Sequence, residues 1–291
     1  MASLFGFEIK SDLPLRRLNP TPGTRGTLAV ASAAEPLTSP YREPVSTLVD
    51  DAGLCWYASY ELEGGRCLLE LPPSGSFLVD PGAGRVVVDR QDGDDELLEH
   101  RIASSALCVL LALRGDLVLH ASAVEVDGRA TIFCGPTQRG KSTLARALGE
   151  DGHRLLGEDG IAIELEGDEP IAFPGARGVR TRSRDEEGRN RTDLIGDPGG
   201  GAPPPCPVAA VVLLEERGET LTVDRLEPAP ALALLTPNLV HSGGRGAIGD
   251  AFANLATLLG AVPAFAASLP DDLDLLSRSA QDLLDATCPD G

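Results

Sequence analysis

At 291 residues, the chain is long enough for one large domain or two modest ones with an ample core. Its 44 acidic residues outnumber its 25 basic residues and give a net charge of -19. This charge argues against non-specific binding to nucleic acid or to an anionic membrane, because both need a basic protein surface. Hydrophobic residues make up 42% of the chain and aromatic residues only 4%, so the core is expected to consist of Leu, Val, Ile and Ala.

The N-terminal residues and the cysteines indicate a cellular compartment. Met1–Lys10 has neither a charged leader nor a long apolar stretch, so we expect no signal peptide. No run reaches about 20 apolar residues, the length that a membrane-spanning helix needs. The six cysteines form no C-x-x-C pair, which predicts reduced, packed cysteines that hold no metal. We therefore expect a cytoplasmic protein.

The first third of the chain is expected to be rich in short strands, because apolar runs there alternate with Gly, Pro and Asp. This pattern predicts a small β-rich N-terminal domain over residues 1–96. The acidic stretch Gln91–Glu96 is expected to be a linker or a helix cap. The predicted strands are Phe5–Ile9, Thr27–Val30, Leu54–Tyr57, Arg66–Leu71, Phe77–Val79 and Arg85–Val88.

A helix and a hairpin are predicted next. Glu99–Leu113 has apolar residues at helical spacing, and Leu117–Val126 is typical of a strand. Asp127-Gly128 is a favoured two-residue hairpin turn that leads into a second apolar run, Ala130–Cys134. The two strands are therefore expected to be antiparallel, unlike strands of a plain doubly wound fold, which are joined through helices.

A phosphate-binding loop follows the second strand of this hairpin. The sequence fits G-x-x-x-x-G-K-[ST] at every required position and is followed by helix-forming residues. The backbone N–H groups of such a loop and the N-terminus of the helix favour an anion at one place. The predicted nucleotide-binding residues are Gly135, Pro136, Thr137, Gln138, Arg139, Gly140, Lys141, Ser142 and Thr143.

The rest of the chain is expected to hold a loop, a strand and helices. Gly178–Gly201 is polar and rich in glycine, and we expect a mobile loop there. Val208–Leu214 is predicted to be a second buried strand. Ala251–Leu284 is predicted to be helical, with interruptions at Pro263 and Pro270.

A P-loop enzyme also needs acidic residues, and the sequence offers two candidates. Leu155–Ile163 contains Glu158 and Asp159 and lies one helix after the loop. Val211–Glu216 is an apolar strand ending in two acids, as in a conventional second nucleotide motif. Acidic residues are common where a strand ends and a loop begins, so neither segment by itself identifies the acids of the site.

At this point a resemblance to a known family becomes visible. Gly152–Asp159 reads G-H-R-L-L-G-E-D, and His120 precedes Gly135 by 15 residues. With the P-loop, these residues resemble the catalytic domain of HPr kinase/phosphorylase, whose members carry a histidine, a P-loop and a G-H-R-L-x-x-D-D segment in this order. The similarity covers about residues 97–291 and is specific from His120 to Ile163. Phe5–Leu15 is similar to the start of the shorter HPr-kinase-related proteins, some of which sit beside peptide-modification enzymes.

The resemblance implies a fold and a set of roles. The fold is α/β, a mixed-sheet P-loop kinase domain of the HPr kinase and phosphoenolpyruvate carboxykinase type over residues 97–291. The resemblance also implies that Lys141 contacts the β- and γ-phosphates of ATP and that Ser142 and Asp159 bind Mg²⁺. Glu158 matches the acid that takes the proton from the attacking serine hydroxyl, and His120 matches a histidine near the phosphates. A homo-oligomer is implied as well, since family members often assemble into multimers.

The sequence departs from the family at two places. Glu158 replaces an aspartate, which moves the carboxylate out by one methylene and affects the positioning on which base catalysis depends. No convincing counterpart of the family's segment for HPr binding and phosphorolysis follows. We therefore expect an ATP-dependent kinase whose acceptor is a hydroxyl of a peptide, a protein or a small molecule other than HPr.

Two other functions stay open from the sequence. One is a conventional P-loop ATPase that uses the acids at the end of Val211–Glu216. The other is a non-catalytic nucleotide-binding or assembly protein, in which Glu158 marks lost chemistry.

Overall fold

The computed structural model describes residues 3–16, 18–19, 22–41, 43–49, 55–91, 94–136, 139–167, 169–176, 179–184, 190–195, 203–241, 245–272 and 275–287. The fold is α/β with mixed sheets. Contacts divide the chain into two units. Unit 1 comprises Met1–Val118 and Val240–Asn254, and unit 2 comprises Leu119–Leu239 and Leu255–Gly291.

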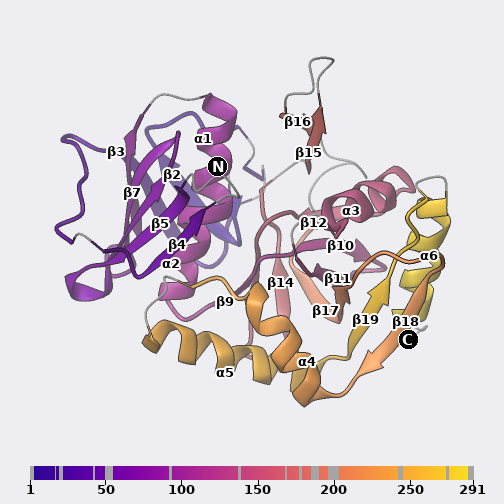
Figure 1. Ribbon diagram of the computed structural model, residues 1–291. Coiled ribbons are helices and arrows are strands. Elements are labelled where there is room, and N and C mark those ends of the chain that lie inside the picture. The colour runs from indigo at the N-terminus through magenta and orange to yellow at the C-terminus, as the bar shows by residue number, and fades with distance from the viewer. Residues whose placement is uncertain are drawn as a thin grey trace. The chain divides into compact units, whose positions relative to one another are not determined.

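Unit 1 contains an eight-stranded sheet in the order β1-β2-β3-β8-β7-β6-β5-β4 (Figure 1). Strand β3 is parallel to β2 and β8, whereas β4 to β8 form an antiparallel meander. The predicted strands are found with shifted ends, and β1 and β4 are additional. The strands are β1 (Ser3–Leu4), β2 (Phe7–Ser11), β3 (Thr27–Ser32), β4 (Ser46–Val49), β5 (Cys55–Glu61), β6 (Cys67–Leu71), β7 (Gly75–Asp80) and β8 (Arg85–Arg90), with the 3-10 turn η1 (Glu63–Gly65) before β6.

The predicted helix is present and begins earlier than expected. It consists of α1 (Asp95–Arg101), the π-helical turn η2 (Ile102–Ala106) and α2 (Leu107–Leu113). Asp94 caps α1, since its carboxylate accepts a hydrogen bond of 2.8 Å from the backbone N–H of Glu96. Helix α2 contacts β7 and β8, so this helical stretch belongs to unit 1. The boundary drawn from the sequence between residues 96 and 97 differs from this division of the chain.

A second sheet has nine strands in the order β12-β10-β11-β17-β14-β13-β9, with β19 beside β17 and β18 beside β19 (Figure 1). Its strands are β9 (Leu117–Leu119), β10 (Ser122–Val126), β11 (Arg129–Cys134), β12 (Arg154–Gly157), β13 (Ile161–Glu164), β14 (Ile171–Phe173), β17 (Cys206–Leu214), β18 (Thr222–Leu226) and β19 (Ala264–Ser268). Strand β17 is parallel to both β11 and β19, whereas β10 is antiparallel to β11 and β12. The sheet is thus mixed, as predicted.

The hairpin before the P-loop is confirmed. Val126 pairs with Arg129, and the two turn residues have positive φ values of 50° for Asp127 and 81° for Gly128. The single strand predicted over Leu117–Val126 is instead divided into β9 and β10. The division falls at His120, whose backbone N–H donates to the carbonyl of Asn238 at 2.7 Å rather than to a neighbouring strand of the hairpin.

Two other sequence predictions are corrected by the structure. The segment Gly178–Gly201 is not a loop throughout, because β15 (Val179–Arg184) and β16 (Asn190–Ile195) pair as an antiparallel hairpin. The C-terminal segment is not all helical. Strand β19 lies between α5 (Arg245–Ala261) and α6 (Leu276–Thr287), where its backbone pairs with β17 and β18. Helix α4 (Pro228–Leu235) and the 3-10 turn η3 (Thr236–Asn238) were not predicted.

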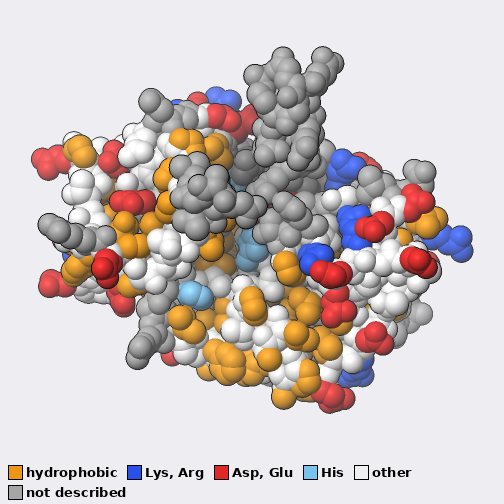
Figure 2. Space-filling view, viewed as in Figure 1, with side chains coloured by type: hydrophobic (Ala, Val, Ile, Leu, Met, Phe, Trp, Pro, Cys, Tyr) orange, Lys and Arg blue, Asp and Glu red, His pale blue; other side chains and the backbone are white. Residues whose placement is uncertain are grey.

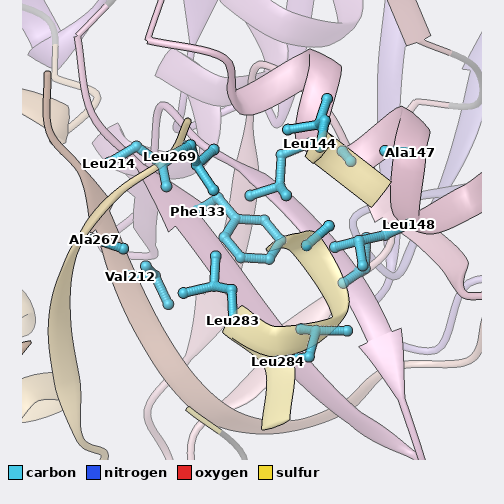
Figure 3. Packing of buried hydrophobic residues seen from close by; sticks show 14 of the residues in the cluster. Phe133, Leu144, Ala147, Leu148, Val212, Leu214, Ala267, Leu269, Leu283 and Leu284 are labelled. Carbon is cyan, nitrogen blue, oxygen red and sulfur yellow. The ribbon is translucent and has the colours of Figure 1, made fainter. Parts of the chain in front are cut away.

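One apolar cluster fixes the helix that follows the P-loop, α3 (Lys141–Glu150), against the sheet and α6 (Figure 3). Phe133 of β11 lies at its centre, and Leu144 and Leu148 reach it from α3. Leu283 and Leu284 approach from α6. Burying a side chain of this size contributes about 1.5–3 kcal/mol. The cluster therefore holds α3, and with it the loop that precedes it, in a fixed position.

The structure describes cysteines and helices, the features from which the sequence predicted a compartment. Five cysteines within the described residues are free thiols, and burial raises the pKa of Cys67 and Cys134 to about 12. Such groups are protonated, poor metal ligands. Among the described helices, none combines the length and hydropathy needed to cross a membrane.

Candidate active site

The strand directions of unit 2 bring three chain segments to one edge of the sheet. Strand β11 ends at Cys134 and β12 ends at Gly157, while β10, which is antiparallel to both, begins at Ser122. In the registers, Ser122 pairs with Phe133 and Ala123 pairs with Gly157. The P-loop, the Glu158–Asp159 segment and the residues before β10 therefore leave the sheet together.

The glycines of the P-loop are required by its geometry. Gly135 has a φ of 137°, and a methyl group built on it would lie 2.6 Å from the carbonyl oxygen of Leu214 on β17. The loop thus turns against the neighbouring strand at a distance that only glycine allows. Gly140 has a φ of 99° and is the N-cap of α3. The loop therefore leads directly into the positive end of the helix macrodipole.

Lys141, the first residue of α3, has a side chain folded into the loop. It is only 6% exposed, and its Nζ donates hydrogen bonds to the carbonyls of Gly135 at 2.7 Å and Pro136 at 3.2 Å. Burial lowers the pKa of Lys141, and the nearby charges of Asp159 and Glu158 oppose that shift. The two carboxylates from the end of β12 therefore act electrostatically on the lysine of the loop.

His120 and Asp159 are joined by a hydrogen bond. His120 Nδ1 lies 3.2 Å from the carbonyl oxygen of Asp159. Because a carbonyl only accepts hydrogen bonds, Nδ1 carries the proton and Nε2 is left with its lone pair in the neutral ring. Burial lowers the pKa of His120; the Asp159 carboxylate raises it and Lys141 lowers it. Asp159 has a φ of 60°, an uncommon value for a residue other than glycine.

The acidic residues and Ser142 fit a magnesium ion in their chemistry. Glu158 is 6% exposed and Asp159 is half-buried, and Ser142 lies in the first turn of α3. Carboxylate and hydroxyl oxygens are the ligands that Mg²⁺ takes, usually together with phosphate oxygens and water. Within the described part of the chain, no group of three or more His, Cys, Asp and Glu residues is spaced to hold a metal by itself. A few protein oxygens completed by phosphates are compatible with that finding.

Asn238, at the end of η3, is a site residue that the sequence did not reveal. It is 6% exposed, and its Nδ2 lies 3.2 Å from the carbonyl oxygens of both His120 and Gly135. Asn238 therefore links the histidine segment to the first glycine of the P-loop, the same glycine whose carbonyl binds Lys141. No sequence motif points to Asn238, because it lies 97 positions after Lys141 in a turn that was not predicted.

The second acidic candidate also lies beside the P-loop. Strand β17 is the direct neighbour of β11, with Leu213 paired to Cys134, so its last residues follow the loop closely. Glu216 is exposed and forms an ion pair of 2.7 Å with Arg139 of the loop. The adjacent Arg217 lies over the other end of the loop, with its Nη2 2.9 Å from a methyl group built on Gly140.

The structure thus gathers most of the predicted site. His120, Gly135, Lys141, Glu158 and Asp159 are connected by hydrogen bonds or by electrostatic interaction. Among the other predicted nucleotide-binding residues, Pro136 is exposed, whereas Ser142 and Thr143 are half-buried. Thr137 and Gln138 lie outside the described residues. On the face seen in Figure 2, Asp and Glu side chains are more widely spread than Lys and Arg.

Comparisons with known proteins add little to this geometry. No protein-family model matches the chain, and no curated protein matches its sequence. One of the similar solved structures is the Hpr(Ser) kinase/phosphatase from Coxiella burnetii, with a TM-score of 0.32 and 15% sequence identity. The similarity covers 57% of this chain and 89% of that chain. A TM-score of this size does not establish a common fold, so the function of this chain must be derived from its own site.

Proposed function

We propose that the protein is an ATP-dependent kinase that transfers the γ-phosphoryl group to a hydroxyl, above all that of a serine. One observation carries this proposal: a buried P-loop lysine, Lys141, within electrostatic reach of the paired acids Glu158 and Asp159. Phosphoryl transfer needs cationic groups at the phosphates and a carboxylate near the attacking hydroxyl, and the lysine and the two acids of this site suit these two roles.

The loop and α3 would bind the triphosphate. Backbone N–H groups of the loop and the positive end of α3 stabilise phosphate charge. Lys141 exchanges its hydrogen bonds with the carbonyls of Gly135 and Pro136 for bonds to phosphate oxygens. Because Lys141 is buried, water only weakly screens the attraction between its ammonium group and the phosphate.

Glu158 would be the general base and Asp159, with Ser142, would hold the metal. The acceptor oxygen attacks the γ-phosphorus, the bond between that phosphorus and the β,γ-bridging oxygen breaks, and ADP leaves with the bond electrons. The proton of the acceptor hydroxyl passes to the Glu158 carboxylate. Mg²⁺, when bound, neutralises charge on the phosphates. His120 orients the Asp159 segment through its Nδ1 hydrogen bond.

The acceptor is proposed to be a peptide, a protein or a small molecule other than HPr, met in the cytoplasm. We also retain the homo-oligomer as a proposal. The predicted N-terminal domain, residues 1–96, is a candidate for acceptor recognition, because all the site residues described above lie outside it.

A second candidate function is a P-loop ATPase that uses Glu215 and Glu216, which follow the strand next to the P-loop. Its support is weaker, because Glu216 is already bound to Arg139 and both acids are exposed. A non-catalytic nucleotide-binding protein is the third, and it requires that ATP binds without phosphorylation of any acceptor.

A labelling experiment tests these functions. Wild-type protein is incubated with γ-labelled ATP, Mg²⁺ and host-cell extract separated into peptide, protein and small-molecule fractions. The variants are Lys141→Ala and Glu158→Gln, with Glu215→Gln as the matched control. A kinase labels one fraction, loses the label in the first two variants and keeps it in the control. Release of free phosphate alone, unaffected by Glu158→Gln, would refute the kinase.

A further inference from the structure

We propose that Arg217 contacts the terminal phosphate of the bound nucleotide and makes the site prefer a triphosphate to a diphosphate. This inference rests on the proposed function in one respect only, that the P-loop binds a nucleotide. Arg217 belongs to no motif recognised in the sequence, and it follows the second acidic candidate rather than the P-loop.

The first support is the position of the guanidinium. A methyl group built on Gly140 would lie 2.9 Å from Nη2 of Arg217 and 3.7 Å from both its Cζ and its Nε. The guanidinium therefore approaches Gly140, the N-cap residue of α3, and Nη2 is its nearest atom. A phosphate at the start of this helix lies within reach of that group.

The second support is the backbone that carries Arg217. Strand β17 runs parallel to β11, so the turn after it leaves the sheet at the same edge as the P-loop. This turn is anchored on both sides of Arg217. Ser268 Oγ donates to the carbonyl of Glu216 at 2.5 Å, and the N–H of Gly218 donates to the carbonyl of Leu269 at 3.0 Å. The arginine is thus presented by a fixed main chain.

The third support is electrostatic. The N-terminus of a helix carries partial positive charge, so a cation placed there is unfavourable without an anion. Arg217 and Lys141 both lie at the start of α3. Glu216, the nearest acid in sequence, is bound to Arg139 instead. Among the residues that the structure describes, no ion-pair partner of Arg217 is found. A phosphate at this point would relieve the repulsion.

The direction from which Arg217 approaches the loop indicates which phosphate it contacts. The backbone of a P-loop encloses the inner phosphates of a nucleotide. Arg217 approaches the loop from the neighbouring strand β17 and not from the loop itself, so we assign it to the phosphate that the loop does not enclose. A guanidinium can donate two parallel hydrogen bonds to such a group, which an ammonium cannot do. ATP has this phosphate and ADP lacks it.

Calorimetric titration with ATP and with ADP, each with Mg²⁺, tests the inference. The proteins are wild type, Arg217→Ala, Arg217→Lys and Arg278→Ala. Arg278 lies exposed on α6 and serves as the control for removing one positive charge. We expect Arg217→Ala to raise the Kd for ATP at least about tenfold and that for ADP less than about twofold. Arg217→Lys is expected to lie between wild type and Arg217→Ala, and Arg278→Ala is expected to match wild type.

The outcomes are distinguishable from failure of the proposed function. If wild type binds neither nucleotide, the P-loop assignment is wrong and the inference falls with it. If wild type binds ATP and Arg217→Ala binds ATP equally well, or loses both nucleotides equally, only the inference is overturned. Melting temperatures without nucleotide show whether each variant is folded. Arg217→Gln replaces Arg217→Ala should the smaller side chain prevent folding.

Discussion

The close approach of Gly135 to Leu214 determines how the P-loop is mounted on the sheet. At this position a side chain meets two obstacles, a φ of 137° and the carbonyl oxygen of Leu214. The loop that carries the P-loop motif is therefore positioned by main-chain contact with the next strand, and the requirement for glycine is steric as well as conformational.

We predict that Gly135→Ala lowers the free energy of unfolding by at least about 2 kcal/mol and abolishes ATP binding. Gly152→Ala is the matched control, because Gly152 also has a positive φ, 102°, but nothing lies within 4 Å of its built methyl group. That control is expected to cost about 1 kcal/mol and to retain ATP binding. Urea unfolding and nucleotide titration measure both effects. Equal losses in the two variants would contradict the role of the Leu214 contact.

Asn238 connects two parts of the site through one amide group. We predict that Asn238→Ala destabilises the protein by about 1–3 kcal/mol, because the part-buried carbonyl of His120 and the buried carbonyl of Gly135 lose a donor. ATP affinity is expected to fall as well, since the carbonyl of Gly135 also positions Lys141. Asn254→Ala removes an exposed bond of 2.9 Å to the carbonyl of Gly115 and is the control. Denaturation and ATP titration that show no difference between the two variants would exclude the linking role.

Elements place the site by packing, and α3 is the clearest case. Its apolar residues lie in the cluster around Phe133, together with residues of α6, which is more than 100 positions later in the sequence (Figure 3). We predict that Leu148→Ala reduces stability by about 2–5 kcal/mol. Leu275→Ala, at a position that is 48% exposed, is expected to change stability by less than about 0.5 kcal/mol. Chemical denaturation of wild type and both variants at one pH measures the three free energies of unfolding.

Strands β10 and β12 are joined by an ion pair that predicts an acid-sensitive part of stability. Glu125 Oε2 accepts a hydrogen bond of 2.7 Å from Arg154 Nε. Burial raises the pKa of Glu125, but the bonds from Arg154 and from the N–H of Gly128 outweigh burial and hold this pKa below its usual 4.5. A carboxyl whose folded pKa is depressed contributes stability above its unfolded pKa and loses it as pH falls through the folded pKa.

Glu125→Gln is therefore expected to be less stable than wild type at pH 7, with the difference shrinking as pH falls below about 4.5. Glu169→Gln removes an exposed partner of Arg129 at 3.5 Å and is expected to show almost no difference at any pH. Urea denaturation of the three proteins between pH 7 and pH 3 makes the comparison. A constant difference for Glu125→Gln across this range would contradict the assignment.

The elements also show what the sequence could and could not predict. The hairpin and the order of strand, loop and helix around the loop motif were predictable, because Asp127-Gly128 and the glycines of the motif act through local backbone geometry. Strand β19 was not, since a short apolar run such as Ala264–Ser268 takes its form from the strands beside it. The contacts of Asn238 and Arg217 depend on pairing between segments far apart in sequence, which no local pattern encodes.

At the scale of the whole molecule, unit 1 is built from two separate pieces of chain. The chain passes between the units at three points, and two of them lie together. Leu119 pairs with Leu239, and the N–H of Val240 donates to the carbonyl of Val118 at 2.9 Å. His120 directly follows Leu119, and Asn238 directly precedes Leu239. The site residues therefore begin where the chain enters unit 2.

Removal of residues 1–96 is accordingly predicted to prevent folding rather than to release an active kinase domain. Helix α2 would lose its contacts with β7 and β8, and its buried leucines would face water. Circular dichroism and thermal unfolding of the fragment measure the result. A soluble fragment that melts cooperatively would instead favour a domain boundary at residue 97.

The divided first unit has a consequence for inheritance. A domain encoded by one uninterrupted stretch can be gained, lost or exchanged by a single genetic joining event. Unit 1 also needs Val240–Asn254, which is encoded after most of unit 2. No single crossover can replace it without also replacing the residues of the site. The two units of this protein are therefore expected to have diverged together, as one gene with one history.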